Sequence, residues 1–312
     1  MEIMTAPMAG ITDYSFRRIL NEFSPDVIFT EMADVSAVVN KNKKTIDEIL
    51  KAENNESVQL FGSKTDNFKE AVKILLEMGF THIDINLGCP MKKIIKSGKG
   101  AALLEEPEYI RKLLTEIKKE YKDDIALSIK IRVGYKDFND PFYYVRLAEE
   151  LKLKQICIHG RTQKQGYQGD ADWEIIKKIK ENSNNIKIIG NGDLFNIEDI
   201  INKTRESKVD GIMLARGILG NPWLIKQAKD YFNNENMKKY DVSKREKRNL
   251  LIKHINYYII DKGENRAFLN MKKHIFWYLS DFYNIKIIKK EISNLGNIKE
   301  ILSYIEKNIE DR

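Results

Sequence analysis

Apolar and polar residues alternate with two different periods from the first residue to about residue 232. Short segments with a period of two, typical of strands, are followed by segments whose apolar residues recur every three or four positions, typical of helices on a sheet. The predicted strands are residues 3–8, 27–31, 57–61, 82–87, 127–133, 155–159, 187–190 and 211–215. The predicted helices between them include 68–78, 107–121, 142–151, 173–180 and 197–203. Eight alternating strands and helices predict an α/β fold, a closed (β/α)8 or TIM barrel.

The periodicity changes near residue 232. Beyond it the strand pattern stops, and residues 243–309 read as three or four helices, including 244–258 and 264–279. We therefore predict a catalytic barrel domain over residues 1–232 and a C-terminal all-α helical domain over residues 233–312. The length is sufficient, since such a barrel takes about 250 residues. The chain starts almost on its first predicted strand, so we expect little sequence to cover the floor of the barrel.

The charge is distributed unevenly between these two parts. Of a net charge of +7, residues 233–312 contribute +6, from 17 Lys and Arg against 11 Asp and Glu. A basic appendage on a nearly neutral body is typical of a protein that binds a polyanion such as RNA. The alternative is that the lysines of a lysine-rich chain simply coat solvated helix faces.

The cysteine content and the lack of long apolar stretches restrict the class of protein. The two cysteines, Cys89 and Cys157, lie far apart without a CxxC motif, which excludes a disulfide framework and a thiolate metal site. No stretch approaches the roughly 20 uncharged apolar residues of a membrane span. We expect a cytoplasmic monomer with no metal and no membrane attachment.

The clearest chemical signal comes at the end of the fourth predicted strand, where residues 84–90 read Asp-Ile-Asn-Leu-Gly-Cys-Pro. Gly88 permits a bend and Pro90 keeps Cys89 out of helical geometry, so the thiol should lie on a loop. A lone cysteine is most often a small buried hydrophobe. The basic, glycine-bearing residues 91–101 that follow are too polar for a core, however, and favour a functional thiol.

Other polar residues also fall at strand ends, where α/β barrels carry their active sites. Lys130 shares one face of its strand with Arg132, and a lysine in mid-strand is better explained by an anionic ligand than by a paired core position. His159 precedes a glycine, and its neighbour Arg161 offers several donors to an anion. We favour a ligand contact for His159 over a structural role, and a core position for Cys157.

These motifs together resemble one family. Residues 86–90, Asn-Leu-Gly-Cys-Pro, followed by an isoleucine at 94 and Gly-Ala at 100–101, resemble the signature of the tRNA-dihydrouridine synthases, flavoenzymes that reduce one uracil ring in transfer RNA. The ends of predicted strands one, three, five, six, seven and eight resemble their counterparts in that family, in order. Residues 271–278 resemble its helical RNA-binding domain. The resemblance covers nearly the whole chain and is closest to the bacterial type.

The resemblance implies an enzyme that binds FMN, reduces it with NADPH, and passes a hydride to C6 of a uridine in tRNA while Cys89 protonates C5. A thiol with an unperturbed pKa of about 8.5 keeps its proton at neutral pH, as a general acid must. The implied FMN contacts are Pro7, Met8, Ala9, Gln59, Lys130, His159, Asn191, Gly192, Asp193, Ala215 and Arg216. The expected substrate contacts are Asn86, Lys92, Lys93, Arg161, Lys272 and Lys273.

Other functions remain open at this stage. An FMN-dependent barrel that reduces a free pyrimidine would share the flavin and Lys130, but it gives no role to the basic helical segment. A catalytically silent barrel could bind RNA without reducing it. The substrate could also be ribosomal rather than transfer RNA, and the sequence does not identify the uridine.

Overall fold

The computed structural model describes residues 1–53, 56–64, 66–135, 140–233 and 241–309. The chain divides into two compact units, Met1–Asp13 with Asp26–Ala215, and Tyr14–Pro25 with Arg216–Arg312. The sequence predicts a boundary at residue 232 between a catalytic part and an RNA-binding part. This assignment of functions to the two parts stays a prediction. By compactness, residues 14–25 and 216–232 group with the helices that follow that boundary. Residues 234–240 and 310–312 of the predicted helical domain lie outside the described residues.

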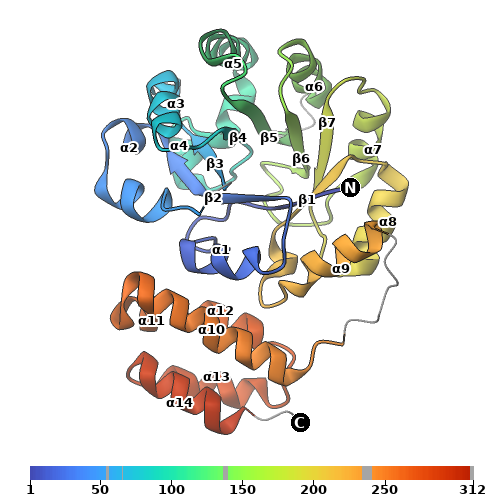
Figure 1. The fold of residues 1–312 in the computed structure, drawn as a ribbon. Helices are drawn as coiled ribbons and strands as arrows, with labels where there is room; N and C mark the ends of the chain where they lie inside the picture. The colour runs from blue at the N-terminus through green and yellow to red at the C-terminus, as the bar shows by residue number, and fades with distance from the viewer. Residues whose placement is uncertain (54–55, 65, 136–139, 234–240, 310–312) are drawn as a thin grey trace. The chain divides into compact units, whose positions relative to one another are not determined.

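The first unit is a closed barrel of eight parallel strands, which confirms the predicted fold class (Figure 1). Each strand pairs with the next, and β1 pairs with β8 to close the barrel. The predicted strands 57–61 and 82–87 agree with the structure at both ends, and the others differ by a few residues. The strands are β1 (Glu2–Thr5), β2 (Val27–Asp34), β3 (Ser57–Phe61), β4 (His82–Leu87), β5 (Ala126–Gly134), β6 (Gln155–Thr162), β7 (Lys187–Asn191) and β8 (Gly211–Leu214).

Helices follow the strands and cover the outside of the barrel (Figure 1). In α5 the buried residues Ile110, Leu113, Leu114 and Ile117 have the spacing of one helix face, which is why this segment packs on the sheet. The helices of this unit are α2 (Val35–Val39), α3 (Phe68–Glu77), α4 (Lys92–Lys96), α5 (Pro107–Tyr121), α6 (Pro141–Glu150), α7 (Trp173–Glu181) and α8 (Ile197–Ser207), with a π-helical turn at Thr45–Ile49 and a 3-10 turn at Gly100–Glu105.

The interior of the barrel has an apolar side and a polar side. Cys157 is buried in the apolar cluster, as predicted, and its Sγ lies 3.7 Å from Met213 Sδ. The polar side comes from β3, β4 and β5, whose buried residues include Gln59, Asp84 and Ser128. The apolar cluster consists of Met4, Ala6, Val27, Phe29, Cys157, Ile189 and Met213.

The second unit is helical in the residues that the structure describes. Segment 241–309 holds five helices, where the sequence suggested three or four, because the single helix expected over 264–279 is wrong. Two helices replace it, interrupted at Met271, although Met271 N still donates to Ala267 O. None of the helices described is both long and apolar enough to cross a membrane. The helices are α1 (Tyr14–Asn21), α9 (Trp223–Phe232), α10 (Lys244–Lys262), α11 (Glu264–Asn270), α12 (Lys272–Tyr278), α13 (Ile285–Asn294) and α14 (Ile298–Asn308).

Candidate active site

Polar side chains of β3, β4 and β5 meet inside the barrel. The strand register places Gln59 beside Asp84, and Asn86 beside Lys130. Residues two apart on a strand share a face, so Asp84 and Asn86 both project to the interior while the intervening Ile85 packs under the helices. Asn86 and Lys130 lie nearer the carboxyl ends of their strands, the end where α/β barrels carry active sites.

The deeper part of this polar side is a chain of hydrogen bonds that ends on Asp84. Ser57 Oγ lies 2.8 Å from His82 Nδ1, His82 Nε2 lies 3.1 Å from Ser128 Oγ, and Ser128 Oγ donates to Asp84 Oδ1 at 2.6 Å. Because Ser128 gives its only proton to Asp84, it must accept from His82 Nε2. Burial lowers the pKa of His82 to about 3, which agrees with this neutral tautomer. Burial raises the pKa of Asp84 to about 6, so its carboxylate predominates at neutral pH.

The same carboxylate orients two amides that lead to the thiol. Gln59 Nε2 donates to Asp84 Oδ2 at 2.7 Å, and Asn86 Nδ2 donates to Gln59 Oε1 at 2.6 Å. Each amide is therefore fixed in one orientation, since a carboxylate only accepts. Asn86 Oδ1 then accepts from Gly88 N at 3.0 Å and from Cys89 N at 2.9 Å. Asn86, expected at the substrate, thus also shapes the turn that carries Cys89.

Cys89 lies on the loop after β4, as the sequence predicted, with 8% of its surface exposed. Burial raises the pKa of its thiol, against the opposing effects of a backbone hydrogen bond at Met91 and the positive charges of Arg132 and Lys130. The thiol is therefore protonated at neutral pH. The chain returns to Cys89 at Gly100, which has φ 61° and where a Cβ would lie only 3.0 Å from Cys89 Cβ. A glycine is required there.

Lys130 is half-buried inside the barrel. Its Nζ donates to Asn191 Oδ1 at 3.0 Å, and Asn191 Nδ2 donates in turn to Met213 O at 2.7 Å. Burial lowers the pKa of Lys130, and the charge of Asp84 opposes that shift. Among the described residues no carboxylate forms an ion pair with Lys130. This cation can therefore serve an anionic or electron-rich ligand.

The turn after β7 has a restricted backbone. Gly192 has φ 125° and Asp193 has φ 49°. A Cβ at Gly192 would lie 2.6 Å from the Cβ of Ala171, so the turn has no room for a side chain there. Trp173 Nε1 donates to Gly192 O at 2.9 Å, and Lys203 Nζ donates to Asp193 O. Both carbonyls therefore accept a hydrogen bond from a side chain, which stabilises the turn. The turn lies at the end of the barrel where phosphate is often bound.

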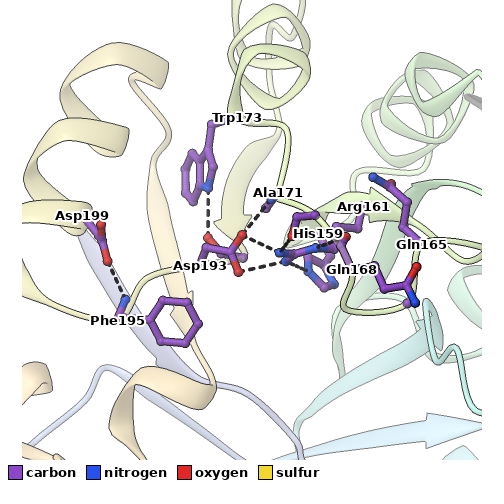
Figure 2. A network of polar contacts seen from close by, with 12 residues as sticks. His159, Arg161, Gln165, Gln168, Ala171, Trp173, Asp193, Phe195 and Asp199 are labelled. Carbon is purple, nitrogen blue, oxygen red and sulfur yellow. Dashed lines mark hydrogen bonds and ion pairs between the residues drawn. The ribbon is translucent and has the colours of Figure 1, made fainter.

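Figure 2 shows a buried ion pair between Arg161 and Asp193 beside this turn. The Arg161 guanidinium is 2% exposed, and it donates to both carboxylate oxygens of Asp193, at 2.9 and 2.6 Å. It also donates to Gln168 O at 3.3 Å and to Gly169 O, while Ala171 N donates to Asp193 Oδ2 at 2.7 Å. Arg161 therefore braces the loop after β6 against the turn after β7. Its expected substrate contact stays a prediction.

His159 lies beside the same pair. Its Nε2 is 3.4 Å from Arg161 Nη1, and it is the register partner of Asn191 on β7. A Cβ at Gly192 would lie 3.1 Å from His159 Cδ2. The structure thus brings His159 together with the Asn191–Asp193 turn, although nothing in it tests the flavin contact expected of these residues.

The segment after β1 and the residue after β8 form an apolar wall next to the polar groups. Met8 and Ala215 pack against the apolar cluster of the barrel interior while remaining partly exposed. Pro7 is half-buried and Ala9 is exposed. Met8 N donates to Thr12 Oγ1 at 2.9 Å, which fixes the course of this segment. The contact of these side chains with a flavin ring stays a prediction.

The remaining predicted residues are Lys92, Lys93, Arg216, Lys272 and Lys273. Lys92 and Lys93 are exposed on α4, close in sequence to Cys89. Arg216 begins the second unit, and Lys272 and Lys273 lie on α12 of that unit. Lys272 Nζ lies 4.4 Å from the centre of the Phe268 ring. Their contacts with phosphate or RNA stay predictions.

Sequence reasoning assigned no role to Asp84 or Arg132, although both belong to the site. Asp84 orients Gln59 and Asn86, and Arg132 Nε donates to Gly88 O at 2.8 Å. The strand parity that singled out Lys130 contained the signal, since Arg132 shares its face and Asp84 shares a face with Asn86. Among the described residues no group of three or more His, Cys, Asp or Glu side chains could hold a metal ion.

Comparison with known proteins gives consistent results. The family model described as dihydrouridine synthase matches residues 4–311. A tRNA-dihydrouridine synthase B of Pasteurella multocida is 32% identical over 313 residues, covering 97% of this chain and 91% of that protein. A probable tRNA-dihydrouridine synthase 1 of Synechocystis is 30% identical over 305 residues, covering 96% and 83%.

Solved structures share the fold at low identity. Histamine dehydrogenase from Rhizobium sp. 4-9 superposes with a TM-score of 0.55 at 13% identity, over 82% of this chain and 49% of that one. A 2-naphthoyl-CoA reductase complex gives a TM-score of 0.52 at 10% identity, over 75% and 50%. The chain thus spans about half of each of these structures, and the likeness concerns the barrel fold.

Proposed function

The chain belongs to the dihydrouridine synthase family, and on that premise we propose that it reduces a uridine of tRNA to 5,6-dihydrouridine. The observation that carries the proposal is the Cys89 thiol, which is buried, protonated and held at the carboxyl end of β4 by Asn86. A weak acid at the mouth of a barrel fits the protonation of a carbon atom.

The chain's residues fit an FMN cofactor. The turn at Gly192 and Asp193 is held at the end of the barrel where phosphate is often bound, the Lys130 ammonium has no carboxylate partner among the described residues, and Met8 and Ala215 provide an apolar wall. We propose that Pro7, Met8 and Ala9 border the flavin ring, with Gln59 and Lys130 at its polar edge. The proposed residues at its phosphate end are His159, Asn191, Gly192, Asp193, Ala215 and Arg216.

In this proposal bound FMN, reduced by NADPH, supplies the hydride that adds to C6 of the uracil ring. Cys89 donates the proton that C5 takes up, and Asn86 holds the turn that positions Cys89. The positive charge of Lys130 favours electron-rich groups in the site. The target base must leave its stack to reach the barrel. We propose that Lys92, Lys93, Lys272 and Lys273 contact the RNA backbone.

The test supplies purified protein with NADPH and unmodified tRNA, and dihydrouridine is mapped afterwards. We expect new dihydrouridine at defined positions, and FMN as the flavin released on denaturation. The control is tRNA that is already fully modified, which should cause no NADPH oxidation beyond the background. Reduction of free uracil or orotate without reduction of RNA would contradict the proposal, and reduction of ribosomal RNA alone would replace its substrate.

A further inference from the structure

Arg132 is a buried arginine whose described hydrogen bonds all go to main-chain carbonyls, and its guanidinium carbon also lies 5.8 Å from the centre of the Tyr167 ring. It lies on β5 with 2% of its surface exposed. Its Nε donates to Gly88 O at 2.8 Å, and its Nη1 donates to Thr162 O and Gly166 O, both at 2.9 Å. Among the described residues no carboxylate pairs with it. A buried guanidinium without a counter-ion is costly and calls for an explanation.

One end of Arg132 holds the turn that carries the thiol. Gly88 directly precedes Cys89, and Asn86 Oδ1 already accepts the N–H groups of both residues. Arg132 donates to the carbonyl of Gly88. The turn is therefore held by hydrogen bonds to two of its N–H groups and to one of its carbonyls. The packing is close, because a Cβ at Gly88 would lie 3.5 Å from Arg132 Cγ and 3.3 Å from Ile131 C. Arg132 therefore holds the Gly88 carbonyl, and with it one side of the Cys89 turn.

The other end of Arg132 holds the loop after β6, which is fixed from its far side. Figure 2 shows Arg161 and Asp193, which pair with each other and form hydrogen bonds to residues further along that loop. Asp172 N also donates to Gly160 O at 2.6 Å, which ties the end of the loop to the strand. Arg132 thus connects the Cys89 turn to a segment that is already rigid.

The charge of Arg132 acts on the sulfur as well. Burial lowers the pKa of Arg132 to about 10, so the guanidinium stays charged at neutral pH. Its charge lowers the pKa of Cys89, against the larger effect of burial. When Cys89 acts as an acid its S–H bond breaks, the proton goes to C5, and the electron pair stays on sulfur. A buried thiolate then needs a nearby cation.

We propose that Arg132 is a positioning residue for Cys89, which holds the Gly88–Cys89 turn against the loop after β6 and stabilises, by its unneutralised charge, the thiolate that remains after proton donation. This inference rests on the proposed function, because it assumes that Cys89 is an acid. It gives a role to a buried cation at the site that the FMN fit does not use.

The test measures the thiol itself. In a Cys157→Ala background Cys89 is the only cysteine, so the rate of alkylation by iodoacetamide between pH 7 and 11, measured on the flavin-bound protein as purified, gives the titration midpoint of Cys89. Arg132→Met should raise that midpoint by about one pH unit, equivalent to a ~10-fold lower thiolate fraction at fixed pH. Arg132→Gln keeps donors but no charge, and it should raise the midpoint similarly.

Arg132→Lys separates the two parts of the role. It keeps the positive charge but loses the planar guanidinium with its several donors. The titration midpoint of Cys89 should therefore stay near that of the parent, while RNA reduction slows by roughly 10-fold. The matched control is Arg146→Met, which removes an exposed arginine paired with Asp140 at 2.8 Å and should change neither quantity. Circular dichroism identifies variants that fail to fold. If Arg132→Met fails to fold, Arg132→Gln and Arg132→Lys still test the proposal.

An unchanged midpoint in a folded Arg132→Met or Arg132→Gln protein would overturn the charge role, and full RNA reduction by Arg132→Lys would overturn the positioning role. The alkylation midpoint requires neither RNA nor NADPH. A failure of this inference is therefore distinguishable from a failure of the proposed function, which would appear as absence of RNA reduction in the parent protein.

Discussion

At the scale of single residues, the two cysteines show how position decides chemistry. Cys89 lies on the loop after β4, and Cys157 lies in the apolar cluster inside the barrel. Burial raises the pKa of both thiols, that of Cys157 to about 12. Cys89 alone has hydrogen-bonded support for its turn, from Asn86 and Arg132. Of the two thiols, Cys89 is therefore the one whose position fits the proposed proton donation.

Replacing Cys89 by Ala should separate the two half-reactions. We expect flavin binding and flavin reduction by NADPH to remain nearly intact, while uridine reduction slows by roughly 10²–10⁴-fold, the usual contribution of a positioned acid. Rapid-mixing absorbance measures the first, and dihydrouridine formation the second. Cys157→Ala is the matched control and should cost about 1 kcal/mol of stability with little loss of activity. Undiminished RNA turnover by Cys89→Ala would remove Cys89 from the mechanism.

Replacing Lys130 by Met should lower the flavin content of the purified protein or slow its reduction. The variant keeps an unbranched side chain one atom shorter and removes the ammonium group, whose described hydrogen bond is to Asn191. The ratio of flavin to protein absorbance measures occupancy. Lys178→Met, a change at an exposed lysine of α7, serves as the control. Normal occupancy together with a normal reduction rate would show that Lys130 does not contact the flavin.

At the scale of secondary structure elements, the barrel strands were predictable because each has two faces in different surroundings. The alternation in β4 fixed its bounds and put Asp84 and Asn86 on one face. What that face contacts depends on the register between neighbouring strands, which the sequence pattern does not encode. The bond from Asn86 to Gln59 joins residues 27 apart, and the pair of Arg161 with Asp193 joins residues 32 apart.

The second unit illustrates the opposite case. The pattern over 264–279 is continuous, so it predicted one helix, but the structure has α11 and α12 with a break at Met271. Met271 is fully buried, and α12 begins directly after it. Packing of this kind is set by neighbouring helices rather than by local periodicity.

The core of these helices contains two buried histidines. His254 on α10 and His274 on α12 have ring centres 4.8 Å apart, and His254 stacks on Phe16 of α1 at 5.2 Å. Both are buried, and none of their ring nitrogens has a hydrogen-bond partner among the described residues. Burial lowers the pKa of His254 to about 3 and that of His274 well below its usual value.

We therefore expect stability to fall as the pH drops below about 6.5. In the window between the folded pKa of about 3 and the unfolded value near 6.5, the unfolded chain binds more protons, so acid favours unfolding. The loss for His254 between pH 7 and pH 5 is on the order of 2 kcal/mol. Urea unfolding followed by circular dichroism at both pH values measures it. His254→Phe keeps the ring stacking without a titrating group and should lose less; an equal loss would contradict this assignment.

At the scale of the whole molecule, the basic excess of residues 233–312 is only partly available to RNA. Lys244 and Lys247 both pair with Asp281, at 2.9 and 2.6 Å, and Arg248 Nη1 donates to Ile309 O at 2.8 Å. On α13, by contrast, Lys286 and Lys290 are exposed. The net charge of a segment was readable from the sequence, but the division between paired and available cations required the structure.

If the second unit binds tRNA, the exposed lysines should carry the salt dependence. Replacing Lys286 and Lys290 together by Gln should reduce the slope of log affinity against log salt concentration by about 1 for each lost phosphate contact. Binding of unmodified tRNA over a potassium chloride series gives the slope. Lys244→Gln, which removes a lysine already paired with Asp281, should change it little. Identical slopes for the double variant and the parent would place the RNA contacts elsewhere.

The composition of the second unit also has a consequence for synthesis on the ribosome. Helix α1 lies in the sequence between β1 and β2, yet Phe16 packs against His254 and His274. At roughly 5–20 residues per second, the 238 residues from Arg17 to His254 take about 10–50 s to translate. During that interval the apolar face of α1 has emerged without its final partners. The nascent chain should therefore need a chaperone to cover α1 until the last helices are made, even when the barrel strands have already paired.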